Sequence, residues 1–471
     1  MSDVGEVTRL ADFERARTVD QSRWGDGRLV LLALMTVLCL IGLVMVLSAS
    51  TVESLRQYGS PWYYFERQAL WLGLGTAAFA VTWRVDYHRW RRFGVIAVAV
   101  CLVLLVAVLL PGAGVAGGGS ARWIGLGSWR LQPSELAKLS LALFAADVLD
   151  RRSHRIREWR YGMVPVLLAF GAMAVLIMAQ PDMGTTVILA FIVAAALFVA
   201  GAPMRPLAAA MGAGAVAAFV AAKASPYRWQ RMTAFLHPFA QASNAGYQSA
   251  QSLVALGSGH LLGMGLGASR AATGYLPNQY TDFIYAIIGE ETGLLGTLMV
   301  AGLFVALAVV GIRVACRARD CFGSVLVAAI TAWLVGEAVI NIGAVVGLLP
   351  VTGVPLPFVS YGGSSLVIAM GAIGICANVA KQGVRASHAR GGGRATADVA
   401  ATEGVAAPVT GPNLVRDPAA SRGRGATVTP IDAARRTAPH EVAAPFPRGR
   451  SSATVGAGMR PAGDRSAKPR R

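Results

Sequence analysis

The chain has 471 residues, of which 55% are hydrophobic and only 14% are charged. Soluble domains carry about 25% charged residues, so this composition excludes an ordinary soluble enzyme or binding module. The formal net charge of +18 first suggests nucleic-acid binding, but residues 381–471 alone hold 16 Lys or Arg against 6 Asp or Glu. Most other cations lie in short gaps between apolar runs, a pattern that indicates contact with anionic membrane lipid and no nucleic acid.

Ten apolar runs succeed one another along the chain. A helix needs roughly 20 apolar residues to cross a bilayer core of about 30 Å, and these runs approach that length. They lie at 29–49, 68–83, 93–110, 134–149, 162–180, 184–201, 206–222, 283–312, 322–347 and 362–384. We therefore predict an all-α polytopic membrane protein with about ten transmembrane helices.

Arginines gather in alternate gaps between these runs. The richer gaps hold Arg84, Arg89, Arg91 and Arg92, then Arg151, Arg152, Arg155, Arg157 and Arg160, then Arg205, then Arg313, Arg317 and Arg319. Because short cytoplasmic loops are enriched in Lys and Arg, these gaps and both termini are predicted to be cytoplasmic. An even number of helices satisfies that topology. We expect the protein in the plasma membrane.

Composition divides the chain into three parts. Residues 1–28 form a predicted cytoplasmic segment, 29–384 a transmembrane domain, and 385–471 a basic cytoplasmic tail. The tail is rich in Ala, Gly, Pro, Thr and Arg and is predicted to be disordered, because it cannot bury a core. An extracytoplasmic loop at 223–282, between the seventh and eighth helices, is either a plain connector or a functional element. Helical spacing at 245–262 predicts a helix along the membrane surface.

Ionisable side chains inside membrane helices are functional candidates, because burying them is costly. Glu135 and Lys138 are three residues apart, so they share a helix face and form either a structural ion pair or part of a site. Asp182 follows Pro181 and is either a helix N-cap or a site residue. Glu337 and Asn341, four apart, are expected to make hydrogen bonds between helices.

Asp282, at the entrance to the eighth run, is the strongest candidate. The alternative is again an N-cap. Glu290 and Glu291 lie about 12 Å deeper at 1.5 Å per residue, and at least one is expected to face a cavity or a basic partner. The glycines of 257–267 resemble a phosphate loop, but no strand precedes them and no Gly-Lys-Ser/Thr comes after them, so a nucleotide site is not indicated.

Several motifs occur in an order that resembles the SEDS family (shape, elongation, division and sporulation), whose members polymerise peptidoglycan. The matching stretches are Ala121-Arg122-Trp123-Ile124, Gln132-Pro133-Ser134-Glu135-Leu136-Ala137-Lys138, Gln180-Pro181-Asp182-Met183-Gly184-Thr185, Gly246-Tyr247-Gln248, Gln251-Ser252-Leu253, Thr281-Asp282-Phe283-Ile284, Gly289-Glu290-Glu291 and Pro355-Leu356-Pro357-Phe358-Val359-Ser360-Tyr361-Gly362-Gly363-Ser364-Ser365. The resemblance covers residues 29–384. The chain is more similar to the division branch, FtsW, than to the elongation branch, RodA.

The resemblance implies a glycosyltransferase that joins lipid II molecules during cell division, with Asp282 as general base. A partly buried carboxylate suits that role, because burial strengthens its affinity for a proton. The substrate-binding candidates are Arg122, Gln132, Ser134, Glu135, Lys138, Asp182, Arg231, Tyr247, Gln248, Gln251, Ser252, Thr281, Ser360, Gly362, Gly363 and Ser364. Arg122, Lys138 and Arg231 are candidates for binding the pyrophosphate; for Arg122 the alternative is an interfacial residue that snorkels toward the membrane surface.

The resemblance also implies a class B penicillin-binding protein and other division proteins as partners, and a bacterial division site as the location. Mg²⁺ or Mn²⁺ would offset the pyrophosphate charge, although the sequence contains no metal motif. Two positions depart from the family pattern: Tyr280 stands where His is usual, and His237 where Asp is usual.

Two other functions fit the same residues. A lipid II flippase also needs intramembrane acids and lysines, but would distribute them through the midplane, whereas Asp182, Asp282 and the 223–282 loop are predicted at the outer face. A non-catalytic division scaffold would use the helices and tail to recruit other proteins.

Overall fold

The computed structural model describes residues 27–110, 114–117, 120–126, 129–224, 226–240 and 246–403. The chain divides into two units, Met1–Val405 and Ala406–Arg471. The second unit lies outside the described residues, as do residues 1–26 of the predicted N-terminal segment. The helices and strands all belong to the first unit.

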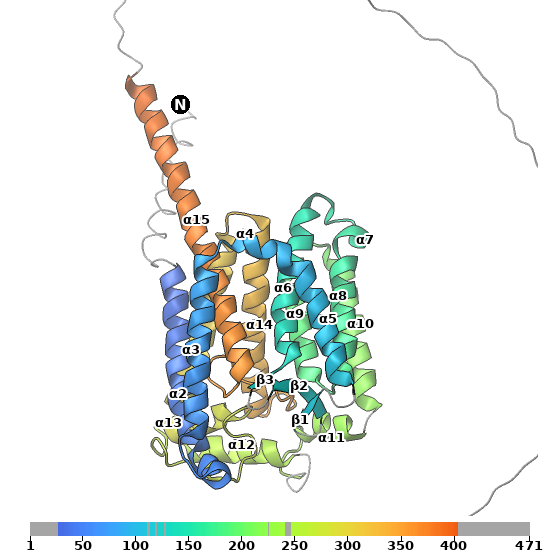
Figure 1. Ribbon diagram of the computed structural model, residues 1–471, viewed down its shortest axis with the longest axis vertical. Helices are drawn as coiled ribbons and strands as arrows, with labels where there is room; N and C mark the ends of the chain where they lie inside the picture. The colour runs from blue at the N-terminus through green and yellow to red at the C-terminus, as the bar shows by residue number, and fades with distance from the viewer. Residues whose placement is uncertain are drawn as a thin grey trace, which may run out of the picture. The chain divides into compact units, whose positions relative to one another are not determined.

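Long helices make up most of the described chain (Figure 1). They are α2 (Gly27–Tyr58), α3 (Tyr63–Arg84), α5 (Gly94–Leu109), α6 (Pro133–Arg151), α8 (Val164–Ala179), α9 (Met183–Val199), α10 (Met204–Lys223), α13 (Ile284–Cys316), α14 (Cys321–Val345) and α15 (Gly363–Glu403). Short helices connect them: α4 (Tyr87–Trp90), η1 (Arg91–Phe93), η2 (Ser153–Arg155), α7 (Trp159–Gly162), α11 (Pro226–Ala234), α12 (Tyr247–Ser258) and η3 (Ala271–Thr273).

The predicted all-α polytopic class is confirmed, and each predicted apolar run falls on one of the long helices. Within the described residues, five helical segments are long and apolar enough to cross a membrane: Gly27–Tyr58, Tyr87–Leu109, Ile284–Cys316, Cys321–Val345 and Gly363–Gly383. Three apolar helices are shorter: Val164–Ala179, Met183–Val199 and Met204–Val220. The chain is therefore a multi-pass membrane protein.

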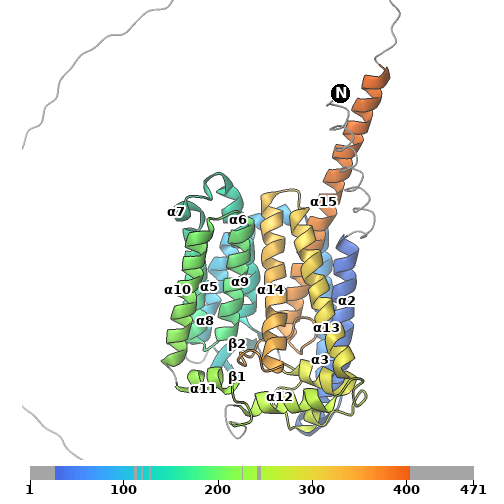
Figure 2. The ribbon, with the colours of Figure 1, turned by 180° about the vertical axis from the view of Figure 1, so that it is seen from behind.

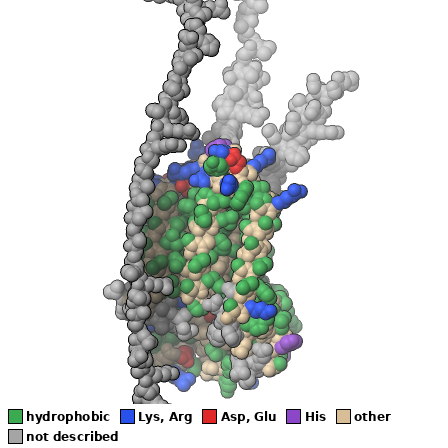
Figure 3. All heavy atoms as spheres, turned by 90° about the vertical axis from the view of Figure 1, so that its right-hand side faces the viewer, with side chains coloured by type: hydrophobic (Ala, Val, Ile, Leu, Met, Phe, Trp, Pro, Cys, Tyr) green, Lys and Arg blue, Asp and Glu red, His purple; other side chains and the backbone are tan. Residues whose placement is uncertain are grey.

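Helix α14 occupies the centre of the bundle and contacts α6, α9, α13 and α15 (Figure 2). Its Trp333 is completely buried. By contrast, Leu168 and Val175 on α8 are 68% and 70% exposed. Figure 3 shows that this flank of the molecule is covered with hydrophobic side chains between charged groups at the two ends. Exposed apolar side chains in such a band are what a bilayer-facing surface requires.

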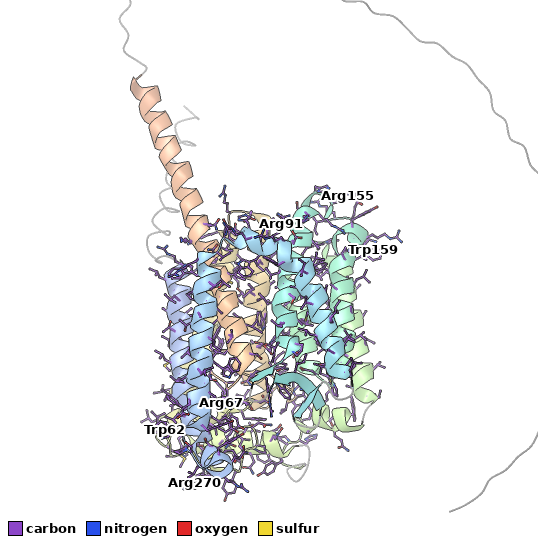
Figure 4. The ribbon with its side chains drawn as sticks, in the orientation of Figure 1. Trp62, Arg67, Arg91, Arg155, Trp159 and Arg270 are labelled. Carbon is purple, nitrogen blue, oxygen red and sulfur yellow. The ribbon has the colours of Figure 1, made fainter. Side chains whose placement is uncertain are left out.

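The two ends of the bundle differ in charge and structure. One end, which we call the basic end, carries α4, η2, α7 and the turn at 317–320, and Arg91, Arg155 and Trp159 lie there (Figure 4). The opposite end, which we call the loop end, carries α11, α12 and the strands, and Trp62, Arg67 and Arg270 lie there (Figures 1 and 4). The basic end is thus formed by arginine-rich gaps that the sequence predicts to be cytoplasmic.

The predicted loop at 223–282 contains regular structure. Helix α12 forms inside the span where the helical spacing predicts one, and it lies across the loop end (Figure 1). Helix α11 and the turn η3 occupy other parts of the loop. The loop is therefore built to hold a definite shape over its described parts.

A small antiparallel sheet between α5 and α6 was not predicted. Its strands are β1 (Val115–Gly117), β2 (Ser120–Leu126) and β3 (Trp129–Leu131), in the order β1-β2-β3. Ile124 pairs with Leu131 across β2 and β3. Strands β1 and β3 have three residues each, too few to show the alternating pattern that identifies a strand in a sequence. The sheet places Arg122 at the loop end.

The last helix is longer than the apolar run that predicts it. The transmembrane domain is predicted to end at residue 384, whereas α15 continues to Glu403. The rest of the predicted tail, residues 404–471, lies outside the described residues.

Glycines of the 257–267 segment pack directly against a break in α13. Gly293 has φ of 69° and ψ of −165°, which interrupts the helix. The amides of Met264 and Gly265 donate to the carbonyls of Glu290 and Glu291 at 2.9 and 3.0 Å. A Cβ on Gly259 would overlap the carbonyl of Gly289. Gly259 and Gly263 therefore permit close backbone contact, and Gly265 and Gly267 adopt positive φ, which accounts for four glycines of the pattern.

Gly259→Ala is expected to lower the free energy of unfolding by about 1–3 kcal/mol, because its Cβ must displace the α13 backbone. Gly257→Ala is the matched control, since nothing lies within 4 Å of a Cβ there, and alanine favours a helix over glycine. Thermal unfolding of the purified protein in detergent measures both. Equal stabilities of the two variants would contradict the packing described.

Candidate active site

Asp282 lies at the loop end, immediately before α13. The N-cap position of α13 is Phe283, which makes no side-chain capping hydrogen bond, and Asp282 stands one residue before it. Its carbonyl oxygen accepts a hydrogen bond of 2.7 Å from Nδ2 of Asn341, which also donates to the carbonyl of Val354 at 2.8 Å. The Asp282 side chain is half-buried. Its position is thus fixed through the backbone.

The segment 352–354 lies between Asp282 and the start of α9. Oδ2 of Asp282 is 3.5 Å from the point where a Cβ on Gly353 would stand, and Gly353 has φ of +76°. On the other side, a Cβ on Gly184 would meet Val354 and Thr352. A glycine at 353 therefore suits both the left-handed backbone and the nearby carboxylate.

Ser360 joins the segment after α14 to the segment before α13. Its hydroxyl donates to the carbonyl of Thr281 at 2.6 Å and accepts from the amide of Leu356 at 2.8 Å. The amide of Tyr361 donates to the carbonyl of Tyr280 at 2.9 Å. Ser360 is buried. Its contacts hold the backbone beside Asp282.

Tyr280, at a position where the resemblance leads us to expect histidine, makes a hydrogen bond to another tyrosine. Its hydroxyl donates to the hydroxyl of Tyr64 at 3.1 Å. Burial raises the pKa of Tyr280 above its usual value. A histidine at this position would titrate near neutral pH, whereas the phenol remains protonated there. Tyr280 therefore contributes packing and a hydrogen-bond donor.

Asp182 caps α9, in agreement with its alternative interpretation as an N-cap. Its carboxylate accepts from the amide of Thr185 at 3.1 Å and from the hydroxyl of Thr185 at 2.9 Å. Arg122 reaches the same turn and donates from Nε to the carbonyl of Gln180 at 3.0 Å and from Nη2 to the carbonyl of Pro181 at 2.6 Å. The guanidinium of Arg122 thus lies next to the start of α9, which packs against Thr352 and Val354.

Lys138 is buried between two carboxylates. Its Nζ lies 2.7 Å from Oε2 of Glu135 and forms a second ion pair with Glu337. The ring of Trp333 lies next to the ammonium group, with its centroid 5.2 Å away. The predicted Glu135–Lys138 pair is therefore present, and Glu337, expected to bond between helices, completes a triad. Because Glu337 and Asn341 are four residues apart, they lie on one face of α14. That face therefore carries both the triad and the amide that bonds to the Asp282 carbonyl.

The start of α6 is tied to the start of α15. The amide of Gln132 approaches Oγ of Ser364 at 3.4 Å, and Nε2 of Gln132 donates to Oγ of Ser134 at 3.0 Å. A Cβ on Gly363 would come within 2.5 Å of Trp71, and one on Gly362 would meet Ser365. The predicted residues of these two segments are thus brought together.

The candidates on α12 hold the loop in place. The hydroxyl of Tyr247 donates to the carbonyl of Tyr275 at 2.8 Å, and that of Ser252 donates to the carbonyl of Val345 at 3.0 Å. Gln248 and Gln251 are half-buried on the same helix. The side chain of Arg231, on α11, lies outside the described residues.

Glu290 and Glu291 accept hydrogen bonds from neutral donors. Glu290 accepts from the hydroxyl of Ser269 and from the amides of Arg270 and Ala271. Glu291 accepts from the hydroxyl of Ser48 at 2.5 Å. Both carboxylates are buried. Hydroxyl and amide donors therefore hold these two carboxylates, and the expected cavity or basic partner stays a prediction.

Metal binding by the protein alone is not indicated over the described ranges, where no group of three or more His, Cys, Asp or Glu could hold an ion. The oxygens of Asp182 already accept from Thr185.

The helical bundle and the polar groups at its loop end define a multi-pass membrane protein with a candidate site at one end of the bundle. A model of the FtsW/RodA/SpoVE family, described as cell cycle proteins, matches residues 28–384, so the chain belongs to this family. Stage V sporulation protein E of Bacillus subtilis is 41% identical over 354 residues, which cover 75% of this chain and 96% of that protein. The probable peptidoglycan glycosyltransferase FtsW of Mycobacterium tuberculosis is 39% identical over 365 residues, 78% of this chain and 70% of that protein.

Solved structures share the fold. One belongs to work described as the structural coordination of polymerization and crosslinking by a peptidoglycan synthase complex. Its chain matches with a TM-score of 0.62 at 25% identity, covering 75% of this chain and 97% of that one. The rod shape determining protein RodA of Thermus thermophilus matches with a TM-score of 0.55 at 26% identity, covering 74% and 95%.

Replacing Lys138 tests the triad. Lys138→Met leaves two buried carboxylates without their cation, so we expect a loss of about 3–5 kcal/mol of unfolding free energy. Arg155→Met is the matched control, because Arg155 also pairs with a glutamate three residues away, Glu158, but at the surface. It should change stability little. A stable Lys138→Met protein in thermal unfolding would show that the triad is not a support of the fold.

Proposed function

We propose that this chain is a peptidoglycan glycosyltransferase that polymerises lipid II during cell division, with Asp282 as the general base. The observation that carries the proposal is a half-buried carboxylate at the loop end, whose backbone is held by Asn341 and whose Oδ2 lies beside Gly353. Membership of the FtsW/RodA/SpoVE family supports it. So do relatives named as probable peptidoglycan glycosyltransferases.

The reaction forms one bond and breaks another. The GlcNAc 4-hydroxyl of one lipid II molecule attacks C1 of MurNAc on the other lipid-linked molecule. The bond from that C1 to the lipid pyrophosphate breaks. The hydroxyl proton passes to Asp282, and the pyrophosphate leaves with the bonding electron pair. A positioned base contributes typically 10²–10⁴-fold to such a step.

Arg122 is assigned to the leaving pyrophosphate. Its guanidinium already lies at the turn before α9, next to the segment that contacts Asp282. A cation there would stabilise the negative charge that develops on the leaving group. Lys138 has a different task, because its ammonium is buried against two carboxylates. We assign it to positioning α6 against α14.

Mg²⁺ or Mn²⁺ is proposed as an accessory ion. Among the described residues, no group of three or more His, Cys, Asp or Glu could hold a metal ion. Both ions accept carboxylate together with phosphate oxygens. When bound, the ion would neutralise part of the pyrophosphate charge.

A class B penicillin-binding protein is the proposed partner. The solved structure that this chain resembles is described as coordinating polymerization with crosslinking in a synthase complex. We place the loop end outside the cell and the basic end in the cytoplasm with both termini, since arginine-rich loops stay inside. The proposed location is the division site, where other division proteins would also bind.

Asp282→Asn is expected to reduce polymerisation of labelled lipid II by roughly 10²-fold or more, because the amide cannot accept the proton. The measurement is the rate of glycan formation by the purified protein, with and without its penicillin-binding partner. Asp86→Asn, at the basic end next to α4, is the control and should remain active. Near-normal activity of a folded Asp282→Asn protein would remove the base assignment. Lipid II translocation without any polymer would favour a flippase.

Chelation tests the accessory ion. EDTA is expected to slow glycan formation by the purified protein, and added Mg²⁺ or Mn²⁺ to restore it, because the ion screens the pyrophosphate charge. Calcium serves as the comparison, since it takes more ligands in a looser geometry. Full activity after exhaustive chelation would exclude a metal role.

A further inference from the structure

An aromatic cluster at the loop end connects the corner between α2 and α3 to the segment that carries Asp282. Five of its rings contact one another, those of Tyr58, Tyr63, Tyr64, Tyr280 and Tyr361. Trp62, the chain neighbour of Tyr63, packs on Phe65 beside them, and we call the five tyrosines and Trp62 the aromatic platform. Tyr64 stands at its centre, with ring centroids 4.5 Å from Tyr280 and 5.2 Å from Tyr361. Tyr280 and Asp282 are two residues apart, at most about 7 Å along the chain. The platform therefore begins next to the proposed base.

The outer part of the platform presents open ring surface. Tyr58 and Tyr63 stack with centroids 3.6 Å apart and ring planes 11° from parallel. Tyr58 is nevertheless 49% exposed, and the neighbouring Trp62 is 51% exposed. Tyr58 thus keeps about half of its surface open although Tyr63 stacks on its ring. Flat aromatic faces carry negative charge, and sugar rings present C–H groups that bind to such faces.

A cation completes the platform. The guanidinium of Arg67 lies over the ring of Tyr63, with Cζ 4.5 Å from the centroid. Arg67 and Trp62 both lie at the loop end in Figure 4. A guanidinium provides donors that suit hydroxyls and carboxylates, which are the polar groups of a peptide-bearing saccharide. Rings and cation together match a glycan chain better than a purely apolar ligand.

We propose that the aromatic platform binds the glycan strand as it extends away from Asp282. This inference rests on the proposed glycosyltransferase function, since the ligand is the product of that reaction. A strand held by its sugar rings stays next to the base between successive additions. The platform thus determines how many additions occur before the strand is released.

The alternative is an anchor at the membrane–water interface, where Trp and Tyr are also enriched. An anchor accounts for the exposed Trp62. It does not account for the continuous ring contacts from Tyr58 through Tyr64 to Tyr280, which lead inward to the segment of the proposed base. The continuity of these contacts favours the glycan.

The test uses the full-length protein and two readouts. The first is binding of a fluorescent, lipid-free oligosaccharide of alternating GlcNAc and MurNAc. The second is the length distribution of strands made from lipid II. Tyr63→Leu is expected to weaken oligosaccharide binding about tenfold, as for one lost stacking contact, and to shorten the strands. Tyr63→Phe keeps the ring and is expected to retain both.

Tyr161→Leu is the matched control. Tyr161 lies under the guanidinium of Arg155, whose Cζ is 4.1 Å from the ring centroid, but it belongs to α7 at the basic end. It should change neither readout. Trp62→Ala provides a second platform variant if Tyr63→Leu fails to fold, as judged by thermal unfolding, and is expected to weaken binding in the same way.

The outcomes separate this inference from the proposed function. Oligosaccharide binding that depends on Tyr63, in a protein that makes no polymer, supports the platform and counts against the glycosyltransferase. Normal polymer with unchanged binding and strand length in Tyr63→Leu and Trp62→Ala overturns the platform alone. Unchanged saccharide binding with weaker insertion into vesicles would also overturn it, in favour of the interface anchor.

Discussion

One amide side chain supports the whole site. Nδ2 of Asn341 donates to the carbonyls of Asp282 and Val354, which belong to two non-helical segments on either side of it. Buried carbonyls without partners are costly, so this amide determines where both segments can lie. One turn earlier on α14, Glu337 holds Lys138. A single helix face therefore fixes the backbone of Asp282 relative to the buried triad.

The dependence on α14 also explains why the site lies at an end of the bundle. Inside a bilayer, non-helical backbone must be buried in protein or line a cavity. Here the segments around Gly353 and Thr281 are short, and their polar groups bond to Ser360, Asn341 and each other's backbone. The polar side chains of the candidate site thus lie at the end of the bundle, where non-helical backbone is tolerated. The apolar middle of the bundle remains helical.

Much of the fold could be predicted from the sequence, because helices that face lipid must be long and apolar. The pairing of Glu135 with Lys138 was also predictable, since both lie on one helix. The partnership of Lys138 with Glu337 was not, because it depends on which helices are neighbours. The break at Gly293 was missed for a similar reason: its cause is backbone contact with Gly263, far away in the sequence. Arg122 was found by resemblance, but its carbonyl partners depend on an unpredicted sheet.

The contact between the 257–267 segment and α13 has a practical consequence for spectroscopy. The amides of Leu294 and Leu295 bond to the carbonyls of His260 and Leu261, so this segment replaces the turn that α13 loses at Gly293. Leu262, directly beside these bonds, is 77% exposed. A fluorophore attached there would track the buried first turns of α13, and would report from the surface on the movement of the helix that carries the site.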